Sequence, residues 1–69
     1  MSSFKYKYII ENNDIDGRFK VVDVEGYPFG DSVSVKGAVI GALAIGIKLS
    51  DIDFNGYWVP VREVLQAVE

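Results

Sequence analysis

Two short segments place carboxylate and amide oxygens at alternating positions before a glycine, as a calcium-binding loop does. The segments are Asn12-x-Asp14-x-Asp16-Gly17 and Asp51-x-Asp53-x-Asn55-Gly56. An EF-hand loop ends in a bidentate glutamate at its twelfth position, where these segments have Asp23 and Arg62. Tight turns favour the same Asp, Asn and Gly residues for backbone reasons. We therefore expect two turns and no metal site.

Few side chains in this sequence could perform catalysis. The chain contains no histidine and no cysteine, so the commonest general base and the thiol nucleophile are both missing. Ser32 and Ser34 have no recognisable activating partner, and the carboxylate pairs lie in turn segments, where solvated structural roles are commoner. The sequence therefore predicts a protein that is not an enzyme and needs no cofactor.

The length of 69 residues predicts one small domain, 1–69, with a marginal core of its own. Because cysteine is absent, disulfides cannot support that core, and we expect a homo-oligomer or a bound partner to do so. Ten acidic residues outnumber seven basic ones, for a net charge of −3. General affinity for nucleic acid comes from Lys and Arg, so this charge favours a basic protein partner.

Two segments, 4–11 and 18–24, show the alternation of half-buried strands, and the Asp16-Gly17 turn between them predicts a β-hairpin. The expected apolar face is formed by Phe4, Tyr6, Tyr8, Ile10, Phe19 and Val21. Four cations then share the other face, namely Lys5, Lys7, Arg18 and Lys20. That face is either a basic patch for nucleic acid or a solvated face partly neutralised by neighbouring acids.

Aromatic residues in two segments are candidate anchors for a protein partner. The expected loop over 25–31 contains Tyr27 and Phe29 beside Asp31, and the later segment over 51–60 contains Tyr57 and Trp58. Tyr and Trp bring large contact area to interfaces. The alternative is that these rings fold back over the core.

An apolar run predicts a central helix over 35–49, capped by Ser32 or Ser34. Its large side chains would fill the core, and its small face would let a second copy approach closely. The expected oligomer interface is Gly37, Ala38, Gly41, Ala42 and Ile45. A C-terminal helix over 61–69 is the alternative cover for that face. The run over 37–47 is shorter than a membrane span, so we expect a cytoplasmic protein with no membrane contact.

The order of these elements resembles that of the HicB-type antitoxin domain over residues 8–60. The matching residues are Ile10, Glu11, Asp16, Gly17, Phe19, Val21, Gly26, Gly30, Asp31, Ser32, Ala38, Val39, Ala42, Gly56 and Pro60. The resemblance implies a ββαβ domain, related to double-stranded-RNA-binding domains, that oligomerises and occludes a small RNase toxin.

The expected fold is α+β, with a β-hairpin, a central apolar helix, a further strand or hairpin and a short C-terminal helix. The leading functional hypothesis is a protein-interaction module that binds and inhibits a protein partner, either as an antitoxin or as a phage-encoded inhibitor of a host or defence protein. A nucleic-acid-binding module using the basic hairpin face and a structural homo-oligomer subunit are the alternatives.

Overall fold

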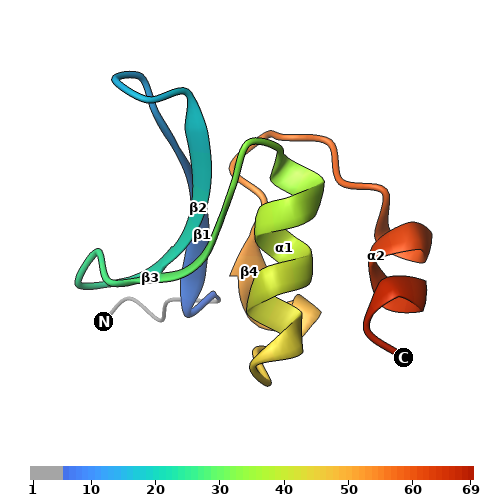
Figure 1. Ribbon diagram of the computed structural model, residues 1–69. Helices are drawn as coiled ribbons and strands as arrows, with labels where there is room; N and C mark the ends of the chain where they lie inside the picture. The colour runs from blue at the N-terminus through green and yellow to red at the C-terminus, as the bar shows by residue number, and fades with distance from the viewer. Residues whose placement is uncertain (1–5) are drawn as a thin grey trace.

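The computed structural model describes residues 6–69 as a small α+β domain with a four-stranded sheet and two α-helices. The elements are β1 (Tyr8–Asn13), β2 (Arg18–Asp23), β3 (Pro28–Ser32), α1 (Val35–Ala44), a 3-10 turn η1 (Leu49–Asp51), β4 (Ile52–Asp53) and α2 (Val61–Ala67). This architecture confirms the predicted fold class (Figure 1).

The sheet has the order β3-β2-β1-β4, with β1 antiparallel to β2 and parallel to β4. The predicted hairpin is present, and Gly17 closes its turn at φ 69°, donating its N–H to the Asn13 carbonyl at 2.7 Å. Asn13 and Asp16 accept backbone N–H groups within that turn through their side-chain oxygens. The acids and amides of this segment therefore serve the turn that we expected.

The segment expected to be a loop over 25–31 instead contributes the edge strand β3, which pairs with β2. Its sequence, Pro-Phe-Gly-Asp-Ser, has poor intrinsic strand propensity. A register shift between Val21 and Val22 lets β3 follow β2 around Phe29. Pairing with a neighbouring strand, which is a tertiary effect, overrides the local preference here.

Helix α1 begins as expected, because the Ser34 hydroxyl accepts the Gly37 N–H at 3.0 Å. It ends at Ala44, however, and the predicted extension to residue 49 is wrong. Gly46 has φ 103° and donates to the Leu43 carbonyl, while Ile47 donates to the Ala42 carbonyl. These bonds form a Schellman motif, in which a left-handed glycine ends the helix.

The core lies between the sheet and the helices, which cover one face of the sheet and leave the other face open (Figure 1). Register pairs Ile10 with Val21, and both side chains are fully buried on the covered face. Val39 of α1 and Val64 of α2 complete this layer. The predicted C-terminal helix is thus confirmed by α2, and Val64 is its buried contact.

The small-residue face of α1 packs against β3 of the same chain, which corrects the predicted oligomer interface. Ala38 and Ala42 are fully buried, so they have no surface to offer a second copy. Gly30 of β3 lies so close beneath them that a Cβ there would overlap the Ala38 carbonyl oxygen. Gly41 faces the Gly30 Cα in the same contact, and Gly37 lies against Ser32. Ile45 alone of the five predicted residues stays largely exposed, at 62%.

Of the two alternatives expected after α1, a further strand or a hairpin, the structure has the strand: β4 is two residues long and a turn follows it. Asn55 and Gly56 have φ values of 54° and 82°, and Tyr57 donates its N–H to the Phe54 carbonyl at 2.9 Å. Positive φ at both central residues defines a type I′ turn, the usual hairpin connection. The chain then continues into α2 instead of a returning strand, with Pro60 as the residue before the helix.

Candidate protein-interaction site

The segment that joins β4 to α2 is held firmly against the sheet. The Asn55 side chain donates to the Ile10 carbonyl of β1 at 2.9 Å, although these residues are 45 positions apart in the sequence. Asp53 accepts the Asn55 N–H at 2.9 Å and stiffens the same turn. In Figure 1 this segment crosses from the sheet to α2 past the start of α1. Because it is pinned at the turn, the residues that follow are presented in a defined position.

Trp58 lies between two anchored neighbours and is itself 80% exposed. The Tyr57 ring packs edge-to-face on Phe19 of β2, with ring centroids 5.4 Å apart. Val59, on the other side, is only 7% exposed and belongs to the core. Tyr57 is half-buried and Val59 is buried, whereas the indole between them stays at the surface. The structure therefore presents a large apolar side chain to solvent from a rigid support.

The five predicted partner-binding residues do not form one surface. Tyr27 and Phe29 join Tyr8 in a chain of edge-to-face ring contacts, with centroids 5.2 and 5.5 Å apart. Tyr57 instead packs on Phe19, whose partner in β1 is four residues beyond Tyr8, or roughly 13 Å along the strand. Phe29 is half-buried and follows the alternative in which such rings fold back, whereas Tyr27 remains mostly exposed.

Asp31, the last of those five residues, is engaged in an ion pair on the open face of the sheet. It accepts a hydrogen bond from Arg18 Nε at 2.7 Å. That hydrogen bond, together with the charge of Asp31, raises the pKa of the Arg18 guanidinium above its ordinary value. Asp31 therefore lies with the predicted basic face, because it pairs with Lys20 and successive residues of a strand point to opposite faces, so Phe19 and the Tyr57 ring lie on the other face.

The predicted basic face is interleaved with acids where the structure describes it. Lys20 lies between Glu11 of β1 and Asp31 of β3 in the sheet register, and Arg18 is paired with Asp31. Lys7 is exposed near the start of β1, and Lys5 lies outside the described residues. Alternating charges across neighbouring strands reduce the positive potential that would attract phosphates.

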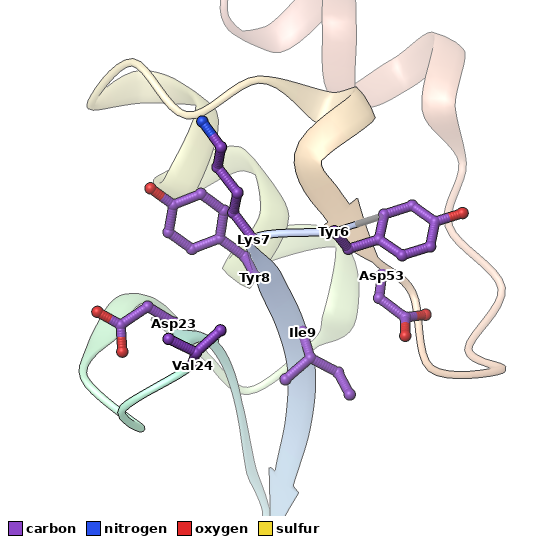
Figure 2. Close-up of a pocket in the computed structure, with 7 residues that line it drawn as sticks. All are labelled: Tyr6, Lys7, Tyr8, Ile9, Asp23, Val24 and Asp53. Atoms are coloured by element: carbon purple, nitrogen blue, oxygen red, sulfur yellow. The ribbon is translucent and has the colours of Figure 1, made fainter. Parts of the chain in front are cut away.

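A shallow hollow of about 420 Å³ lies at the end of the sheet where β1 begins and β2 ends. It is lined by Tyr6, Lys7, Tyr8, Ile9, Asp23, Val24 and Asp53. Figure 2 shows the Asp23 and Asp53 carboxylates on opposite sides, neither aimed at the other. Asp23 accepts the N–H groups of Glu25 and Tyr27, both at 2.9 Å. These carboxylates are occupied by turn hydrogen bonds, and residues 6–69 contain no group of three candidate metal ligands.

A second and larger depression, which we call the β4–α2 groove, measures about 710 Å³. Its lining consists of Tyr6, Leu49, Ser50, Ile52, Phe54 and Leu65. Leu65 of α2 is 42% exposed there. Sequence reasoning missed this groove because its residues come from three separate parts of the chain, at residue 6, over 49–54 and at residue 65.

Among the described residues, no helix has the length and apolar character needed to cross a membrane. Comparisons with protein families, with characterised proteins and with solved structures found no match to this chain.

Proposed function

We propose that this chain is a non-enzymatic protein-interaction module that uses Trp58 as its principal anchor on a protein partner. The single observation that supports this function is an indole 80% exposed between two anchored neighbours. Tryptophan is among the residues that most often dominate interface energies. Because the support is rigid, little conformational entropy is lost when the indole docks.

The role that we propose for this binding is inhibition of a cytoplasmic partner, as an antitoxin or a phage-encoded inhibitor acts. Two features support a blocking role. The sequence contains no histidine or cysteine for chemistry of its own, and the described surface carries a prominent apolar anchor. The acidic net charge of −3 favours a partner with a basic surface.

The test is affinity capture from source cells with two matched variants. Trp58→Ala removes the anchor, and Ile15→Ala removes a side chain that is 96% exposed in the β1–β2 turn. We expect wild type and Ile15→Ala to retain the same protein and Trp58→Ala to lose it. Retention of identical proteins by all three would overturn the proposed anchor.

Intrinsic fluorescence gives an independent reading of the same contact, because Trp58 is the only tryptophan in the chain. Docking of the indole moves it from water to an apolar surface, so its emission should shift to shorter wavelength when the captured partner is added. A partner without tryptophan, or one made with a non-fluorescent analogue, keeps the signal specific. If the partner is an enzyme, an equimolar amount of this chain should suppress its activity.

A further inference from the structure

The β4–α2 groove combines apolar side chains from three parts of the chain around the short edge strand β4. Its apolar lining is supplied by Tyr6, Leu49, Ile52 and Phe54 together with Leu65 of α2. β4 pairs with β1 over two residues only, so it ends before it can cover this space. The apolar lining of the groove is therefore open to solvent. Trp58 is a large apolar side chain that is exposed as well.

Charges beside the two features are complementary. Arg62 follows Trp58 on the first turn of α2, and Asp51 lies between two groove residues, Ser50 and Ile52. Within residues 6–69 the ion pairs are Arg18–Asp31 and Lys36–Glu63. Arg62 and Asp51 thus remain available for a charge pair with another molecule.

We propose that the groove receives Trp58 of a second copy of this chain, with Arg62 of that copy beside Asp51. The groove and the indole both belong to the stretch between residues 49 and 65, apart from Tyr6. A twofold arrangement therefore makes the contact twice, each copy supplying one indole and one groove. This inference rests on Trp58 being an interface anchor, as in the proposed function. The dimer covers the anchor, and a protein partner must compete for it.

The expected affinity of this dimer is low. A buried aromatic side chain contributes roughly 150–250 Å², whereas a standard interface covers about 800 Å² on each partner. The described surface is 4723 Å², so two indole contacts and their rims cover only a small part of it. We expect a dissociation constant in the micromolar range or weaker, which calls for a concentration series up to millimolar protein.

The first experiment follows mass by sedimentation equilibrium and Trp58 emission over that series. We expect mass to rise toward twice that of the monomer as emission shifts to shorter wavelength. Trp58→Ala and the groove variant Leu65→Gln should both remain monomeric, and Ile15→Gln should behave as wild type. Circular dichroism confirms that each variant is folded. A wild type that stays monomeric throughout overturns the inference, as does a folded Trp58→Ala that dimerises like wild type.

The second experiment reverses the two charges separately. Arg62→Glu and Asp51→Lys should each weaken the homodimer about tenfold or more, because each places like charges together. When the two variants are mixed, both contacts of the mixed dimer regain opposite charges, so dimer should reappear. Failure of the mixture to associate more strongly than either variant alone overturns the assigned pairing. Monomeric wild type together with Trp58-dependent capture of another protein would retain the proposed function and remove only the dimer.

Discussion

Two regions of the domain are built in opposite ways. Helix α1 packs closely on β3, whereas a groove lies between β4 and α2. On the β3 side, Gly30 lies directly under Ala38 and Ala42, and the backbones of helix and strand touch. On the β4 side, Phe54 and Leu65 are large, and a groove separates the two elements. Small residues close a contact by letting backbones approach, whereas large residues around a two-residue strand leave apolar surface uncovered. This difference is the reason that we propose the interaction surface on the β4 side.

We expect the largest loss of stability from adding a side chain at Gly30, where β3 touches α1. Gly30→Ala places a Cβ against the Ala38 carbonyl oxygen and 3.0 Å from the Ala42 backbone nitrogen, and neither backbone atom can rotate away. Overpacking typically costs about 1–3 kcal/mol, and we expect the upper end of that range or complete unfolding. Urea denaturation followed by circular dichroism measures the loss. Stability equal to wild type would show that α1 can shift away from β3.

We expect a smaller gain of stability from adding a side chain at Gly41, on the helix side of the same contact. A Cβ at Gly41 would meet only the Gly30 Cα, at 3.7 Å, which is an ordinary contact distance. Gly41→Ala should therefore raise the free energy of unfolding by about 0.5–1 kcal/mol through helix propensity. Gly37→Ala is the matched comparison, because its Cβ would overlap the Ser32 side chain. Denaturation midpoints that rank Gly37→Ala above Gly41→Ala would contradict this account of the contact.

The smallest effect on folding is expected at the most exposed aromatic residue. Trp58→Ala removes a side chain with little buried area, so the free energy of unfolding should change by no more than about 0.5 kcal/mol. Thermal denaturation at low protein concentration, where any dimer is dissociated, provides the measurement. A loss of several kcal/mol would mean that the indole supports the core, and the contrast between the two sides of the domain would weaken.

Much of the fold could be predicted from local patterns in the sequence. The alternation through Ile10 and Val21, the turn at Gly17 and the cap at Ser34 all lie where we expected. These features depend on backbone preferences and side-chain periods that act within a few residues. The end of α1 was also encoded locally, in Gly46, but the apolar residues around it led us to extend the helix too far.

The candidate site was harder to predict because it depends on distant segments. Trp58 belonged to the predicted anchors, but the sequence did not show that Tyr57 and Val59 would be anchored on either side of it. Phe29 and Asp31 were grouped with Trp58, although Phe29 packs on Tyr8 and Asp31 pairs with Lys20 and Arg18 on the open face of the sheet. Exposure is a property of the whole packed molecule, and residue type alone does not determine it.

The sequence by itself determined the first hairpin with its turn and the starts of the two helices, since these follow from short-range backbone and periodicity preferences. Only the tertiary structure decided which apolar residues became core and which became surface. The glycines and alanines of α1 appeared to suit a second copy, yet β3 closes over them because Gly30 allows the backbones to meet. Strand β3 itself exists because β2 and α1 supply the contacts that its own residues cannot. Large apolar side chains stay exposed elsewhere, among them Trp58 and Leu65, which follow a short strand and a tight turn.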